Sequence, residues 1–148
     1  MDYGALDWFM EEHDVLDERL PALAEALRAD DVEWDPFRDE LDRLARELEQ
    51  HLAFEEHRLY PWVAQTLPDA EAALERLARE HVEILSLATT LQFAVAHPRM
   101  AAERQVACAR LVRLLRAHGK TERRLIARAV VSDPALRRGA AGGSAPRR

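Results

Sequence analysis

A His–Glu pair set among apolar residues occurs twice in this chain, and it restricts the possible folds more than any other feature. His51 and Glu55 are four positions apart. The same spacing separates His118 from Glu122. Residues four apart lie on one side of an α-helix, about one turn from each other. Leucines at helical spacing flank both pairs, so both carboxylates are expected to be buried, where they need a compensating positive charge.

Composition favours one small helical domain. The chain has 148 residues, is rich in Ala, Leu, Glu and Arg, and contains only five glycines. A net charge of −6 argues against nucleic acid or an anionic membrane as the main partner. The single cysteine, Cys108, excludes an internal disulfide and a multi-cysteine zinc site. No start typical of a signal peptide and no long apolar run is found, so we expect a cytoplasmic protein; nothing indicates its oligomeric state.

Apolar residues repeat at intervals of three and four over four segments, which predicts four helices. Their approximate ranges are 5–29, 36–67, 69–96 and 99–131. Asp35 is the expected N-cap of the second helix, followed by Pro36 at its first position. Pro21 is expected to kink the first helix without ending it, and Pro61 to distort the last turns of the second.

Short connections between these helices favour an all-α, antiparallel up-down-up-down four-helix bundle with a metal site in its core. The bundle is expected to span residues 1–131. Residues 132–148 are small or basic with little to bury, which predicts a disordered basic C-terminal tail.

Two further histidines, His13 and His81, occupy positions of the apolar stripes on the first and third helices. Residues equally far from the turn that joins two antiparallel helices lie at the same height. His13 and His51 are equally far from Val32, the middle of the first connection. The same test pairs Glu55 with His81, and it brings His81 and His118 within about one helical turn.

Six polar residues are therefore expected in one layer of the core as metal ligands. They are His13, His51, Glu55, His81, His118 and Glu122. The alternative is a metal-free bundle whose core histidines are hydrogen-bonded structural residues. No Lys or Arg lies on the inward stripes near this level, which favours the metal. His57 and His97 fall outside the stripes and are expected to face solvent.

Four imidazoles and two carboxylates are too many ligands for one tetrahedral zinc, and they lack the thiolates of an iron–sulfur site. They fit two metal ions bridged by carboxylates within a helical bundle. The Glu-x-x-His spacing of ferritin-like di-iron proteins is absent, because none of the four histidines has a glutamate three positions before it.

The order of these motifs resembles the hemerythrin-like (HHE cation-binding) domain family over about residues 6–130. One His comes first, then His-x-x-x-Glu, then Glu80-His81, then a second His-x-x-x-Glu. The run from Glu55 to Pro61 also resembles the stretch that follows the second-helix histidine in many bacterial members. The resemblance implies two non-haem iron ions with an oxo or hydroxo bridge, terminal ligands from the four histidines, and bridging by the two glutamates.

One departure from the resemblance concerns a fifth histidine. Oxygen-carrying hemerythrins have two histidines four apart on the third helix, but the positions four before and four after His81 are Leu77 and Leu85. One coordination position is thus left to solvent or to another side chain. Asp17 is the best-placed substitute, although its position also suits a surface carboxylate. Tyr60 lies about 140° around a regular helix from Glu55 and is a poor candidate on that geometry.

Three functional hypotheses follow from these observations. The first is a di-iron protein that binds or senses a small ligand such as O₂, NO or hydrogen peroxide, since apolar residues surround the predicted site. The second is a di-iron enzyme that decomposes peroxide or oxidises ferrous iron, because a missing histidine leaves more open coordination. The third is an iron store, iron donor or iron sensor whose fold depends on loading.

Overall fold

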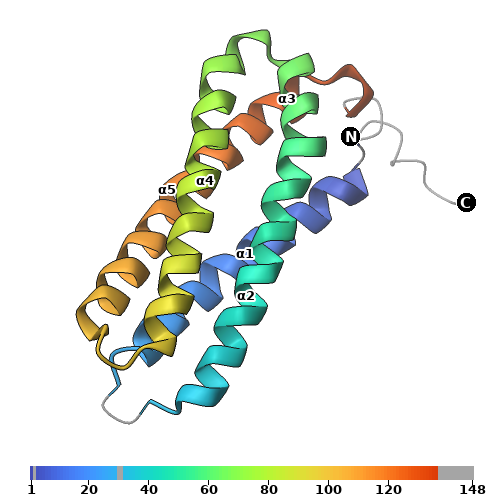
Figure 1. Ribbon diagram of the computed structural model, residues 1–148. Helices are drawn as coiled ribbons and strands as arrows, with labels where there is room; N and C mark the ends of the chain where they lie inside the picture. Colours follow the sequence, from blue (N-terminus) through green and yellow to red (C-terminus); the bar gives the residue numbers. More distant parts are fainter. Residues whose placement is uncertain (2, 30–31, 137–148) are drawn as a thin grey trace, which may run out of the picture.

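The described part of the chain is helical throughout. The computed structural model describes residues 1, 3–29 and 32–136, apart from the side chains of Tyr3 and Asp17. It contains no strand within these ranges, and the predicted all-α class is confirmed. The four long helices are α1 (Tyr3–Ala26), α2 (Trp34–Phe54), α4 (Glu71–Ala96) and α5 (Ala101–Ser132). Successive long helices run in opposite directions, and α2 and α4 cross in front of α1 and α5 (Figure 1).

The second predicted helix is three elements in the structure. After α2 comes a π turn, η1 (Glu55–Leu59), and then the short helix α3 (Tyr60–Thr66). A 3₁₀ turn, η2 (Pro68–Ala70), leads into α4. The backbone N–H of Tyr60 donates to the carbonyl of Glu55, five residues back instead of four. Pro61 follows directly; it has no N–H, and its ring disfavours a regular helical turn, so the predicted distortion takes this form.

Of two other predictions about helix boundaries, the structure confirms one and contradicts the other. α1 continues unbroken through Pro21, as expected. The N-cap prediction for Asp35 was wrong, because α2 begins at Trp34 with Glu33 at the cap. The N–H of Phe37 donates to the Glu33 carbonyl at 3.1 Å, and the rings of Trp34 and Phe37 contact each other at a centroid distance of 6.0 Å. Aromatic packing thus extends the helix by two residues beyond the expected start at residue 36.

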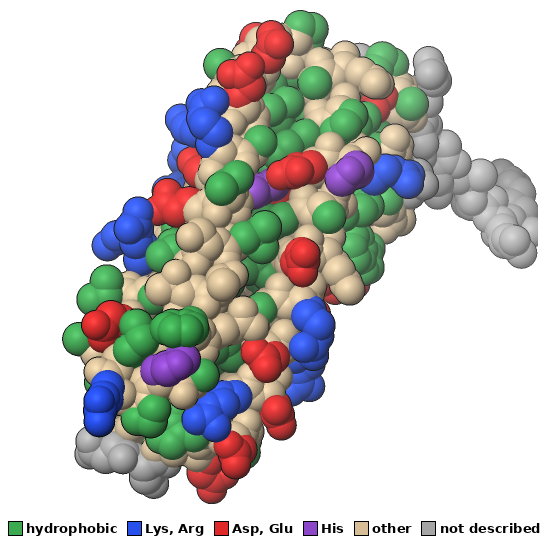
Figure 2. Space-filling model, in the orientation of Figure 1, with side chains coloured by type: hydrophobic (Ala, Val, Ile, Leu, Met, Phe, Trp, Pro, Cys, Tyr) green, Lys and Arg blue, Asp and Glu red, His purple; other side chains and the backbone are tan. Residues whose placement is uncertain are grey.

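The apolar core consists of two clusters, one on each side of the predicted metal level. The upper cluster, at the α3 end of the bundle, comprises Leu6, Phe9, Leu59, Tyr60, Trp62, Val63, Leu67, Ala70, Leu74, Leu77, Leu125, Ile126, Ala129 and Leu136. The lower cluster, toward the opposite end, is centred on leucines of α1 and α2 together with Ile84, Leu91 and Leu111. Charged side chains lie on the outside, where acidic and basic groups are interspersed over the face in view (Figure 2). Within the described residues, no helix combines the length and the apolar character needed to cross a membrane.

The first residues of the predicted tail are packed against the bundle. Leu136 is buried in the upper cluster, and the indole N–H of Trp62 donates to Asp133 Oδ2 at 2.8 Å. A leucine and a hydrogen-bonding carboxylate therefore hold residues 133–136, which the sequence had assigned to the tail. Residues 137–148, the rest of the predicted tail, lie outside the described residues.

Candidate metal centre

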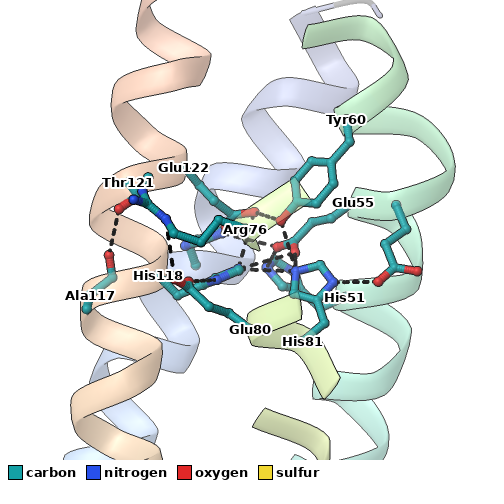
Figure 3. A network of polar contacts seen from close by, with 12 residues as sticks. His51, Glu55, Tyr60, Arg76, Glu80, His81, Ala117, His118, Thr121 and Glu122 are labelled. Atoms are coloured by element: carbon teal, nitrogen blue, oxygen red, sulfur yellow. Dashed lines mark hydrogen bonds and ion pairs between the residues drawn. The ribbon is translucent and has the colours of Figure 1, made fainter. Parts of the chain in front are cut away.

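The structure brings all six predicted site residues together. They project from α1, α2, the start of η1, α4 and α5 into one layer between the two apolar clusters. Figure 3 shows Glu55, His81, His118 and Glu122 converging, with His51 beside them. All six are buried, and Glu55 and Glu122 are only 0% and 1% exposed. His57 and His97 lie on the surface as expected.

One half of the cluster, called here the His81 half, comprises His81, His118, Glu55 Oε2 and Glu122 Oε1. The two Nε2 atoms are 3.2 Å apart. Glu55 Oε2 lies 3.0 Å from the Nε2 of His81, and Glu122 Oε1 lies 3.4 Å from that of His118. Adjacent donor atoms around an octahedral ion with bonds of about 2.1 Å are about 3 Å apart. These four atoms therefore surround a space that fits one metal ion.

Outer carboxylates hold the two imidazoles of the His81 half in position. The Nδ1 of His81 lies 2.7 Å from Glu56 Oε1, and the Nδ1 of His118 lies 2.9 Å from Glu80 Oε2. Each Nδ1–H is thus donated outward, which leaves each Nε2 facing the cluster. Histidine ligands of protein metal sites are commonly oriented by a carboxylate in this way.

The other half, called the His13 half, comprises His13, His51, Glu55 Oε1 and Glu122 Oε2. Glu55 Oε1 lies 2.9 Å from the Nε2 of His51 and 3.5 Å from that of His13. Glu122 Oε2 lies 3.1 Å from the same nitrogen of His13. Each carboxylate therefore presents one oxygen to each half of the cluster.

Several atoms that face the cluster have no hydrogen-bond partner among the described residues. They are both oxygens of Glu55, Glu122 Oε2, and the Nε2 atoms of His13 and His51. Buried polar atoms are normally satisfied, and these lie in a group where a cation would contact every one. The donor set thus fits metal ions.

The pKa values show how strongly the cluster attracts positive charge. Burial opposes charge on His13 and His118, but polar contacts with Glu122 and Glu55 outweigh it and raise their pKa values to about 9 and about 10. Burial alone would raise the pKa of Glu55, yet its contacts with four histidines hold that pKa well below its usual value. The pKa of Glu122 is also lowered, by His118 and His13. In the absence of metal, protons on His13 and His118 supply positive charge to the cluster.

A comparison with protein-family models gives one decisive match. The family described as hemerythrin HHE cation-binding domain matches residues 4–130. The chain belongs to this family. Searches of curated proteins and of solved structures returned no match.

In this HHE domain, Tyr60 enters the cluster, contrary to the prediction that it lies too far around the helix. Its hydroxyl donates to Glu122 Oε1 at 2.6 Å and lies 2.9 Å from the Nε2 of His81. The prediction was wrong because it assumed a regular helix, whereas the π turn adds a residue and turns Tyr60 toward the side of Glu55. Burial and the charges of Glu122 and Glu55 raise the pKa of Tyr60, so it is protonated in the metal-free site.

The sequence signals for these further residues were weak. Pro61 indicated a distortion next to Tyr60 but not its direction. Glu56 and Glu80 are each adjacent in sequence to an inward-facing residue, and this pattern is typical of ordinary surface carboxylates. Asp17, the substitute ligand suggested by the sequence, has a side chain outside the described part of the structure.

Among the described side chains, packing contacts orient the imidazoles of the His13 half. The ring of Phe9 stacks on His51 with centroids 5.0 Å apart and planes 7° apart. His13 lies against Gly119 of α5: a Cβ at that position would be 3.1 Å from His13 Nδ1 and 3.2 Å from Cε1. These distances are shorter than ordinary van der Waals contacts, so the glycine makes room for the imidazole.

We expect Gly119→Ala to weaken metal binding in the His13 half. The added methyl group pushes His13 away from its position, while helix propensity alone would favour alanine by about 1 kcal/mol. Metal titration should show one of two sites weakened, with the other retained. Gly4→Ala, at an exposed position on α1, is the matched control. Equal metal affinity in both variants would contradict the role given to Gly119.

Metal loading is expected to release protons. At pH 7, His13 and His118 are protonated in the metal-free protein, because their pKa values of about 9 and about 10 lie above this pH. A metal ion needs the same nitrogen lone pairs, so anaerobic addition of Fe²⁺ at pH 7 should release about two protons, and affinity should fall as the pH is lowered. Calorimetric titration in buffers of different ionisation enthalpy measures the release. His57→Ala should leave it unchanged, and the absence of any release would contradict the expectation.

Proposed function

We propose that this HHE domain binds two iron ions, one in each half of the cluster, bridged by Glu55 and Glu122 and by an oxo or hydroxo group. The terminal ligands in this proposal are His13, His51, His81 and His118. When bound, the iron pair supplies an open coordination position for a small ligand. We further propose that O₂, NO or hydrogen peroxide binds there and that the protein binds or senses this ligand.

The mixture of donors supports iron. Six ligand residues are too many for one zinc ion, and imidazole combined with carboxylate suits iron better than it suits Ca²⁺ or Mg²⁺, which prefer oxygen. The shared carboxylates support two ions, since Glu55 has one oxygen 2.9 Å from His51 and the other 3.0 Å from His81.

A small cavity beside the His13 half is the observation that carries the ligand-binding proposal. Its volume is about 20 Å³, enough for about one molecule the size of water. It is lined by His13, Leu16, Leu20, His51, Leu52, Glu55, Leu115 and His118. Four leucines thus enclose one side of a polar cluster, and this lining favours a small neutral molecule over a charged one.

The lining of the same cavity gives less support to the enzyme hypothesis and to the iron store or sensor hypothesis. A peroxide-decomposing enzyme needs a proton donor near the bound ligand, and the cavity offers only leucines and the proposed metal ligands. The only support for iron storage or iron sensing is the burial of the two carboxylates. Their burial concerns the binding of iron itself and gives no reason for an open coordination position at the iron. That the protein is cytoplasmic remains an expectation from the sequence.

Metal analysis followed by ligand addition tests the proposal. Aerobically purified protein should hold about two irons per chain and absorb in the visible region through oxo-to-iron charge transfer. Anaerobic addition of O₂, NO and peroxide to the reduced protein should change this spectrum for at least one of them. A single zinc per chain, or an iron pair that responds to none of the three, would overturn it.

Filling the cavity should separate iron binding from ligand binding. Leu115→Phe adds volume at the cavity wall, so we expect an unchanged iron content but a ligand association rate lowered at least several-fold, read by stopped-flow absorbance. Leu114→Phe is the matched control, because Leu114 neighbours it on α5, is also partly buried, and does not line the cavity. Equal rates in the two variants would place the ligand elsewhere.

A further inference from the structure

We propose that the phenol oxygen of Tyr60 is the fifth protein ligand of the iron in the His81 half. This inference rests on the proposed function, because it requires iron in that half. It assigns a side chain to the coordination position that Leu77 and Leu85 leave unfilled on α4.

The position of the oxygen is the first support. It lies 2.6 Å from Glu122 Oε1 and 2.9 Å from His81 Nε2, two atoms that already face the space for the ion. These distances match the spacing of about 3 Å between neighbouring donors on one ion. Figure 3 shows the Tyr60 ring reaching down toward His81 between Glu55 and Glu122.

The contacts on either side of His81 are the second support. Its Nδ1 lies 2.7 Å from Glu56 Oε1 on the outer side of the ring, so Nε2 is the nitrogen that faces the Tyr60 oxygen. The Tyr60 hydroxyl also contacts Glu122 Oε1. The phenol oxygen, His81 Nε2 and Glu122 Oε1 thus border one space, and a cation there would contact all three atoms.

The backbone is the third support. Tyr60 follows the π turn directly, and π turns are frequent at functional sites because they redirect side chains out of the regular helical pattern. The side chain is only 8% exposed, and its ring stacks on His81 with centroids 5.4 Å apart. Its oxygen therefore has a fixed place at the cluster rather than access to water.

The chemistry would be a ligand substitution without electron transfer. A bond would form between the Tyr60 oxygen and ferric iron as a water molecule leaves that position, the phenolic O–H bond would break, and its hydrogen would pass to solvent as a proton. Tyrosine oxygen is an established ligand of protein-bound iron, as in the haem of catalase. With Tyr60 bound, the His81 half has five protein donors and the His13 half has four, which directs an exogenous ligand to the His13 half beside the cavity.

Resonance Raman spectroscopy of the ferric protein tests the inference. Iron-bound tyrosinate should give enhanced ring vibrations and a visible charge-transfer band, both lost in Tyr60→Phe. The chain contains only two tyrosines, so Tyr3→Phe is a matched control that should retain both signals. Ring-deuterated tyrosine incorporated into Tyr3→Phe, in which Tyr60 is the one remaining tyrosine, should shift the vibrations, and this assigns them to Tyr60 even if Tyr60→Phe does not fold.

The outcomes separate this inference from the proposed function. Protein that holds two irons with oxo-to-iron absorption but shows no tyrosinate vibrations would overturn the role of Tyr60 and leave the proposed function standing. Tyrosinate vibrations that persist in Tyr60→Phe would also overturn it. Protein that does not bind two irons would overturn both.

Discussion

Two carboxylates shared between two pairs of imidazoles are the interaction on which the rest of the structure depends. Glu55 and Glu122 are almost completely buried, and their oxygens face nitrogens from α1, α2, α4 and α5. Apolar clusters above and below offer no other compensation for their charge. The four helices must therefore keep one common register, because sliding any of them would remove an imidazole from a buried negative charge.

The two halves of the cluster are built by different physical means. In the His81 half, Glu56 and Glu80 fix the imidazoles by hydrogen bonds from outside. In the His13 half, stacking on Phe9 and close approach to Gly119 position the rings, and leucines enclose the adjacent cavity. Hydrogen bonding raises the basicity of a ligand, whereas apolar packing controls what can approach it. This asymmetry supports the proposal that a small ligand binds at the His13 half rather than at the His81 half.

The elements that could be predicted from the sequence obey regular helical geometry. The spacing of four residues predicted that His51 faces the same way as Glu55, and His118 the same way as Glu122. Equal distances from the turns that join the helices predicted that His13 and His81 lie at the same level. The inward orientation of Tyr60 could not be predicted. It depends on whether the backbone N–H bonds to the fourth or the fifth preceding residue, and tertiary packing around Pro61 decides between the two. The start of α2 and the burial of Leu136 were missed because each depends on packing against particular side chains, the ring of Phe37 for Trp34 and the upper cluster for Leu136.

The π turn also has a consequence for how this chain is compared with its relatives. A π turn amounts to a single-residue insertion into an α-helix, so the side chains that follow it are shifted by one position against a helix without it. A gapless alignment to such a helix would pair Tyr60 with a residue that faces another direction. An alignment of this chain with a helix that lacks the turn therefore needs a one-residue gap between the positions of Glu55 and Tyr60 to pair side chains that face the same way.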